Sequence, residues 1–130
     1  MTGKRAGQRR VLLIDDEPEF VQLIKMRLES HHYDVLTAAD GAEGVRAALR
    51  EQPDVIILDV MMPMRDGFEA LPQLKRHAET RGIPVIMLTA RVEHRAMRQA
   101  QEGQASDYLI KPVESNELLA AIARQLPAGG

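Results

Sequence analysis

The chain alternates between short, continuous apolar runs and longer segments in which apolar residues recur at helical spacing. The runs are too short for helices, are rich in branched residues and stop at polar residues, which is typical of buried strands. One of them, residues 33–37, alternates instead, as a half-covered or edge strand would. The predicted strands are residues 11–14, 33–37, 55–58, 85–88 and 108–110.

The segments between the runs have an apolar period of about 3.6, the spacing of a helix with one buried face. The first stripe comprises Phe20, Leu23, Ile24 and Leu28, and the last comprises Leu119, Ile122, Ala123 and Leu126. Val45, Ala48 and Leu49 mark a helix for which Asp40 is the expected N-cap. Residues 67–76 and 92–101 predict two more helices, and Pro72 is expected to kink or shorten the first of these.

This strict alternation predicts a parallel sheet covered by helices on both faces, because parallel strands need crossover connections. The predicted fold class is α/β, a doubly wound sheet of five βα units. We expect one domain at residues 10–126, with a flexible basic tail at 1–9 and a flexible tail at 127–130.

Composition adds limits to this picture. Hydrophobic residues make up 45% and charged residues 28% of the 130 residues, which is ordinary globular usage. The net charge of -2 gives no reason to expect direct binding of nucleic acid or an anionic membrane, and the basic cluster of Lys4, Arg5, Arg9 and Arg10 is interpreted as a solvated tail. Without cysteine or a long apolar run, the expected location is cytoplasmic, with no membrane association.

Polar residues at the ends of the predicted strands carry the candidate chemistry, because open α/β sheets bind ligands beyond the carboxyl ends of their strands. Each such residue alone is more often a turn former, a helix cap or a solvated side chain. Their joint placement at one rim favours a shared site. The residues at this rim are Asp15, Asp16, Glu17, Asp59, Thr89 and Lys111.

Converging carboxylates repel one another unless a cation lies among them. An all-oxygen group favours a hard ion, and Mg²⁺ commonly takes one or two carboxylates together with waters and a phosphate. Lys111 offers a positive charge and Thr89 a hydroxyl donor, which suit the oxygens of a phosphoryl group. No Ser/His or Cys/His arrangement competes, so the expected nucleophile of this phosphoryl-transfer site is a carboxylate.

Several motifs, in order and at matching spacing, resemble those of bacterial two-component response-regulator receiver domains. The resemblance covers roughly residues 10–126 and implies a flavodoxin-like sheet with strand order 2-1-3-4-5, of the chemotaxis-regulator type. The motifs are Val-Leu-Leu-Ile-Asp-Asp-Glu-Pro at 11–18, Asp-Val-Met-Met-Pro at 59–63 followed by Asp66-Gly67, Thr89-Ala90, and Tyr-Leu-Ile-Lys-Pro at 108–112.

The resemblance implies a role for each matching residue. Asp59 would be the phosphoacceptor and Lys111 would bind the phosphoryl oxygens or pair with Asp59 beforehand. Asp16 would be a direct Mg²⁺ ligand, Asp15 a ligand through water, and Met61 a ligand through its backbone carbonyl.

Other residues would link the phosphoryl group to the switch. Thr89 would hydrogen-bond the phosphoryl group, and Tyr108 would rotate from exposed toward buried. The bond between Lys111 and Pro112 would be cis and aim Lys111 into the site. The side chains of Met61 and Arg91 would flank the phosphoryl group and tune its lifetime.

Two features depart from the family pattern. Gln104 stands where the family usually has Gly, with Gly103 one position early, so we expect the end of the fourth helix to be re-registered. Pro72 is also unusual. Both departures lie away from the phosphoryl site and concern the output surface.

The implied function is a phosphoacceptor switch. Asp59 would take a phosphoryl group, with Mg²⁺, from a sensor histidine kinase or histidine phosphotransfer protein. An unknown downstream protein effector would read the surface made by the fourth helix, fifth strand and fifth helix, through which a monomer could also dimerise weakly. The domain would promote its own phosphorylation and dephosphorylation without being a conventional enzyme. Whether it stands alone or is part of a larger regulator or hybrid kinase is left open by the sequence.

Three alternative functions fit the sequence less well. A phosphorylation-independent interaction module of the same fold is disfavoured because every phosphoryl-site residue is retained. A haloacid-dehalogenase-type phosphatase would need a second Asp where this chain has Met61. A dinucleotide-binding domain would need a Gly-rich turn after the first strand, where this chain has residues 15–18.

Overall fold

The computed structural model describes residues 8–59, 66–89, 105–110 and 113–126. These residues form one parallel sheet with strand order β2-β1-β3-β4-β5, so the predicted fold is confirmed. The helix predicted at 92–101 and the departure at Gln104 lie outside the described residues, as do most of the two predicted tails. The described elements are β1 (Arg10–Ile14), α1 (Pro18–Ser30), β2 (Asp34–Ala38), α2 (Gly41–Glu51), β3 (Val55–Asp59), α3 (Asp66–Arg76), β4 (Val85–Thr89), β5 (Asp107–Ile110) and α5 (Ser115–Gln125).

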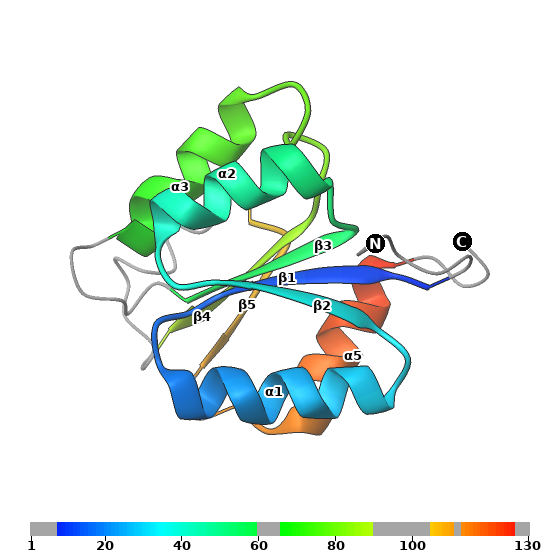
Figure 1. The fold of residues 1–130 in the computed structure, drawn as a ribbon. Coiled ribbons are helices and arrows are strands. Elements are labelled where there is room, and N and C mark those ends of the chain that lie inside the picture. Colours follow the sequence, from blue (N-terminus) through cyan, green and yellow to red (C-terminus); the bar gives the residue numbers. More distant parts are fainter. Residues whose placement is uncertain (1–7, 60–65, 90–104, 111–112, 127–130) are drawn as a thin grey trace.

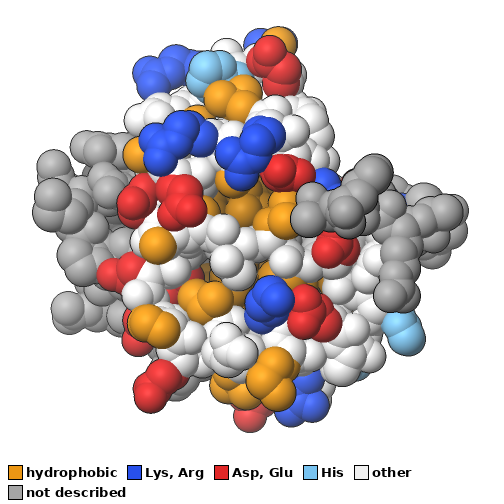
Figure 2. Space-filling model, viewed as in Figure 1, with side chains coloured by type: hydrophobic (Ala, Val, Ile, Leu, Met, Phe, Trp, Pro, Cys, Tyr) orange, Lys and Arg blue, Asp and Glu red, His pale blue; other side chains and the backbone are white. Residues whose placement is uncertain are grey.

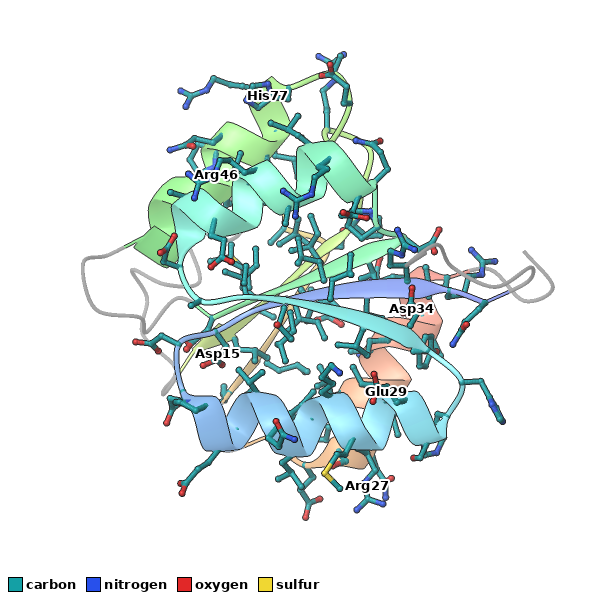
Figure 3. All side chains as sticks on the ribbon, viewed as in Figure 1. Asp15, Arg27, Glu29, Asp34, Arg46 and His77 are labelled. Carbon is teal, nitrogen blue, oxygen red and sulfur yellow. The ribbon has the colours of Figure 1, made fainter. Side chains whose placement is uncertain are left out.

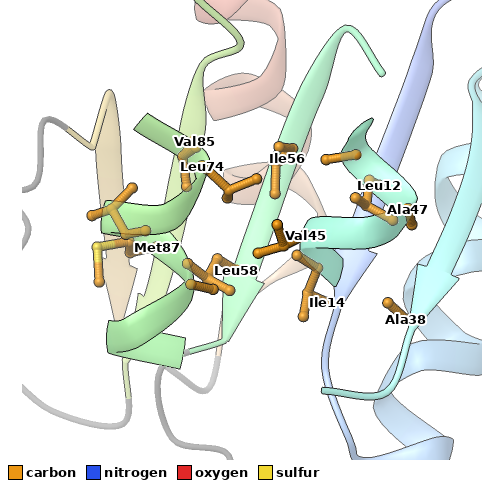
Figure 4. Close-up of a cluster of buried hydrophobic side chains, with 13 residues drawn as sticks. Leu12, Ile14, Ala38, Val45, Ala47, Ile56, Leu58, Leu74, Val85 and Met87 are labelled. Carbon is orange, nitrogen blue, oxygen red and sulfur yellow. The ribbon is translucent and has the colours of Figure 1, made fainter. Parts of the chain in front are cut away.

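The helices cover both faces of the sheet: α2 and α3 lie on one face, and α1 and α5 on the other (Figure 1). Side chains alternate along the strands, so each face has its own core. Leu12, Ile56 and Val85 belong to the core beneath α2 and α3 (Figure 4). Their neighbours Val11, Val55 and Ile86 belong to the core beneath α1 and α5. Burial on both faces explains why β1, β3 and β4 read as continuous apolar runs.

The two remaining strands lie at the edges of the sheet, which explains their weaker patterns. β2 is an edge strand, as predicted, and only Val35 and Ala38 are fully buried in it, one in each core. None of the residues of β5 is fully buried. Helix α2 begins as predicted, because Asp40 Oδ1 accepts a hydrogen bond from the backbone N–H of Glu43 at 2.8 Å.

The predicted stripe of α1 is correct only in part. Ile24 and Leu28 are buried and Phe20 packs against them, but Leu23 is 56% exposed. Residues rotate by about 100° each around a helix, and Val21 rather than Leu23 flanks the buried row on its second side. An apolar residue next to a buried one is therefore not always on the buried face.

The stripe predicted for α5 is also shifted. Leu118, Ala121 and Ile122 are fully buried, whereas Ala123, predicted to face the core, is exposed. Leu118 is not part of the predicted stripe, although it packs in the core beneath α1 and α5. In α3, the exposed Pro72 does not end the helix, which continues to Arg76.

Arg10 does not lie in a solvated tail, so the prediction for this residue is wrong. It is 8% exposed within β1. Its Nε donates to Asp34 Oδ2 at 3.0 Å and its Nη1 donates to Glu51 Oε1 at 3.2 Å, while its backbone N–H donates to Asp54 Oδ2 at 2.7 Å. Burial of a guanidinium is tolerable here because carboxylates surround it.

Among the described residues on the face seen in Figure 2, acidic and basic side chains are interspersed. None of the described helices combines the length and the apolar character that a bilayer crossing requires.

Candidate functional site

The register of the sheet brings the ends of β1 and β3 side by side. Ile14 is the parallel partner of Leu58, so the residues that follow them, Asp15 and Asp59, come at the same level of the sheet. Strand alternation directs both toward the face covered by α1, because Leu13 and Ile57, two residues earlier, lie in that core. Asp15 and Asp59 are 2% and 1% exposed, respectively.

Glu17 joins these two aspartates. One carboxylate oxygen from each of Asp15, Glu17 and Asp59 lies within 4.8 Å of the other two. Glu17 is exposed, so the group has two members inside the protein and one at its surface. Figure 3 shows Asp15 at the junction of β1 and α1, at the opposite end of the sheet from Asp34.

The turn between β1 and α1 is fixed by backbone hydrogen bonds. The N–H of Asp15 donates to the carbonyl of Ala38 at 3.0 Å, which extends the sheet by one bond beyond β1. Asp15 Oδ1 accepts from the N–H of Glu17 at 2.9 Å. Pro18 then starts α1, where its missing N–H costs no hydrogen bond. Asp15 therefore both faces the site and shapes the turn that carries Glu17.

Asp16, predicted as the direct Mg²⁺ ligand, is exposed and is not one of the three grouped residues. Its predicted role stays a prediction. Glu17 is among the residues predicted at this rim of the sheet but not among the predicted ligands. Three acids follow β1 in succession. Because the alternation of side chains ends with the strand, the sequence does not indicate which of them points toward Asp59. In the structure it is Glu17 whose carboxylate joins Asp15 and Asp59.

The other predicted site residues follow β3, β4 and β5. Asp59 pairs with Leu88, and the next residue, Thr89, pairs with Ile110 at the end of β5. The backbone of Thr89 is therefore at the same rim as the acidic group. The side chain of Thr89 lies outside the described residues, as do Met61, Arg91 and Lys111, and their predicted roles stay predictions.

Tyr108, the predicted switch residue, lies in β5 and is partly buried against the core beneath α2 and α3. Its predicted rotation stays a prediction. Ile110, two residues on, is 41% exposed. Arg124 of α5 forms an ion pair with Asp107 of β5 at 2.8 Å, so β5 and α5 are joined at this edge of the sheet.

The chemistry of the acidic group fits a hard cation. Its donors are carboxylate oxygens, without His or Cys, and their mutual repulsion falls when a cation binds among them. Direct ligands of Mg²⁺ lie at about 2.1 Å, so opposite ones are about 4.2 Å apart. Oxygens within 4.8 Å of one another are therefore close enough to hold one ion, directly or through water.

Comparison with known proteins gives the same picture. Residues 11–123 match the response regulator receiver domain family. The chain belongs to this family. Protein PilH of Pseudomonas aeruginosa is 40% identical to this receiver domain over 113 residues, which are 87% of this chain and 93% of PilH. The DNA-binding regulator RpaA of Synechocystis is 42% identical, again over 87% of this chain, but this chain covers only 47% of RpaA.

Solved receiver structures share the fold. The chemotaxis protein CheY4 of Vibrio cholerae has a TM-score of 0.87 and 32% identity, with 92% of this chain and 100% of CheY4 covered. The receiver domain of the sensor histidine kinase PA1611 of Pseudomonas aeruginosa has a TM-score of 0.83 and 31% identity, with 92% and 98% covered. That structure has a magnesium ion coordinated in its active site cleft. The family predicted from the motifs is thus confirmed.

Proposed function

We propose that this receiver domain is the phosphoacceptor switch of a two-component phosphorelay and that Asp59 accepts the phosphoryl group. The proposal depends above all on one observation: Asp59, buried at the end of β3, shares an acidic group with Asp15 and Glu17. In a receiver domain, a carboxylate held in this way has the chemistry of a nucleophile for phosphoryl transfer.

The donor would be a phosphohistidine of a sensor histidine kinase or of a histidine phosphotransfer protein. An oxygen of Asp59 forms a bond to phosphorus while the P–N bond of the donor breaks. The imidazole leaves with the electron pair of that bond and takes up a proton. The domain contributes chiefly position, because Asp59 follows Leu58, which is fully buried in the core.

Mg²⁺ is the proposed cofactor. When bound, it would offset the negative charge of the carboxylates and of the incoming phosphoryl group. Asp15, Asp16 and Asp59, with the backbone carbonyl of Met61, would hold it. The magnesium ion in the related PA1611 receiver domain supports this assignment.

Lys111 and Thr89 are proposed to bind the remaining phosphoryl oxygens, and Met61 and Arg91 to tune the lifetime of the phosphorylated state. The phosphoryl group then shifts the equilibrium between two conformations. The shift cannot exceed the difference between its interaction free energies with the two conformations.

A downstream protein would read the change on the surface formed by the fourth helix, β5 and α5. Tyr108 and Asp107 are neighbours in β5, and the ion pair between Asp107 and Arg124 connects this strand to α5. A displacement of Tyr108 would therefore reach α5. The cytoplasmic location and a monomer or weak dimer through this surface are parts of the proposal.

Phosphorylation by a small acyl phosphate or by a phosphorylated histidine kinase, with Mg²⁺, tests the proposal. Intact-mass spectrometry should show one added phosphoryl group in the wild type and none in Asp59→Asn. Asp40→Asn is the matched control, because Asn caps a helix as well as Asp does and Asp40 lies at the start of α2. Equal phosphate uptake by Asp59→Asn and the wild type would disprove the assignment. A wild type that no donor phosphorylates would favour a phosphorylation-independent interaction module.

A further inference from the structure

We infer that Glu17 takes part in Mg²⁺ binding and helps to determine the affinity of the domain for the ion. This inference rests on the proposed function, because it assigns an additional residue to the same site. It concerns a residue outside the predicted set of Asp15, Asp16, Asp59 and the Met61 carbonyl.

The backbone of Glu17 is held on both sides. Its N–H donates to Asp15 Oδ1 at 2.9 Å, and its carbonyl accepts from the N–H of Val21 at 2.9 Å in the first turn of α1. Asp15 is in turn fixed by its hydrogen bond to Ala38. The starting point of the Glu17 side chain is therefore set by the sheet on one side and by the helix on the other.

The side chain does not do what a residue at this position usually does. Glu17 is the N-cap of α1, but it makes no side-chain hydrogen bond to the first turn of that helix. Asp40, the N-cap of α2, does make such a bond, to the N–H of Glu43 at 2.8 Å. Instead, a carboxylate oxygen of Glu17 lies within 4.8 Å of oxygens of Asp15 and Asp59.

The three acids of this group differ in exposure. Asp15 and Asp59 are buried, whereas Glu17 is exposed and stands on the solvent side of the site. A carboxylate there can accept a hydrogen bond from a metal-bound water, and its charge attracts the cation at a smaller desolvation cost than a buried acid bears. Outer partners of this kind typically contribute 10- to 100-fold to metal affinity.

The chain supplies a matched control. Glu19 is an exposed acid in the first turn of α1, two residues after Glu17, and is not part of the acidic group. Glu17→Gln and Glu19→Gln therefore remove the same charge from nearly the same place on the surface. A difference in Mg²⁺ affinity between the two variants therefore reports a specific role of Glu17 in the site rather than general electrostatic attraction.

Titration calorimetry of Mg²⁺ into the unphosphorylated wild type and these two variants tests the inference. We expect Glu17→Gln to weaken Mg²⁺ binding by about 10-fold and Glu19→Gln by less than about two-fold. The rise in melting temperature on adding Mg²⁺ should shrink in Glu17→Gln alone. Equal Mg²⁺ affinities for the two variants would overturn the inference.

Asp59→Asn separates this failure from that of the proposed function. If Asp59→Asn loses phosphate uptake while Glu17→Gln binds Mg²⁺ like Glu19→Gln, only the role of Glu17 is wrong. If Asp59→Asn takes up phosphate like the wild type, the proposed function is wrong whatever the Mg²⁺ affinity of Glu17→Gln.

Discussion

Gly44 of α2 lies directly against Ile14 of β1. A Cβ atom added to Gly44 would be 2.3 Å from Ile14 Cδ1 and 2.8 Å from Cγ1, and Ile14 is fully buried. Ile14 is the residue before Asp15, so α2 contacts the sheet here just before the chain enters the acidic group. Packing at Gly44 and the position of Asp15 are therefore connected through a single side chain.

Gly44→Ala should destabilise the domain. The added methyl group forces Ile14 to move within a packed core, which costs about 1–3 kcal/mol, and the better helix propensity of Ala recovers about 1 kcal/mol of this. Urea unfolding measures the difference. Gly82→Ala is the control, because a Cβ added there meets no described residue within 4 Å apart from its chain neighbours, and it should change stability by less than about 0.5 kcal/mol. A Gly44→Ala protein as stable as Gly82→Ala would show that Ile14 has room to move.

Arg10→Met should cost about 2 kcal/mol of unfolding free energy. The substitution keeps most of the aliphatic part of the buried side chain, but it removes the cation that the carboxylates of Asp34 and Glu51 share. Breaking a fully buried pair typically costs 3–5 kcal/mol, and the partial exposure of both acids reduces this. Arg50→Met is the control: Arg50 pairs with the same Glu51 at 2.9 Å, but its side chain is 67% exposed, so its loss should be under about 0.5 kcal/mol. Equal losses in the two variants would contradict a special role for Arg10.

Arg10 also shows what the sequence could not predict. The central strands are predictable because buried parallel strands are apolar throughout. Their alternation with helices then predicts a parallel sheet. A charged residue at the start of a strand cannot be distinguished by its pattern from the polar tail that precedes the strand. Its burial depends on acids 24, 41 and 44 residues further along, Asp34, Glu51 and Asp54, which become its neighbours only in the folded chain.

The candidate site was predictable to a similar degree. Asp15 and Asp59 each stand where an apolar run ends, and sheet topology alone brings such positions together. Which of the acids after Asp15 points toward Asp59 depends on the geometry of one turn, and no periodic pattern encodes it. The place of Glu17 in the acidic group is therefore set only in the folded chain.

Thr80→Val should remove about 1–2 kcal/mol of stability at nearly constant side-chain volume. Thr80 is fully buried after α3, and its Oγ1 donates to the carbonyl of Leu74 at 2.6 Å. Without that donor, a carbonyl in the last turn of α3 loses a buried partner. Thr37→Val, at an exposed position of β2, tests the same substitution where it should have almost no cost. Thermal or urea unfolding distinguishes the two, and similar losses would mean that the hydroxyl of Thr80 does not matter.

Lys75 should give the domain a stability that grows with pH under alkaline conditions. Its Nζ donates to the carbonyls of Arg81 and Ile83 at 3.2 and 3.1 Å, and its burial lowers the pKa of the ammonium below the usual 10.5. Between that lowered pKa and 10.5, the unfolded chain binds more protons at this site than the native protein does, so the free energy of unfolding rises with pH. The unfolding free energy of the wild type should therefore rise relative to that of Lys75→Met as the pH approaches 10.5.

Lys25→Met is the control, because Lys25 lies on the surface of α1 and pairs with Glu29. The pH-dependent change in unfolding free energy should be larger for Lys75→Met than for Lys25→Met. An advantage of the wild type that shrinks as the pH rises would mean that the two hydrogen bonds of the partly buried ammonium stabilise the native state more than desolvation penalises it.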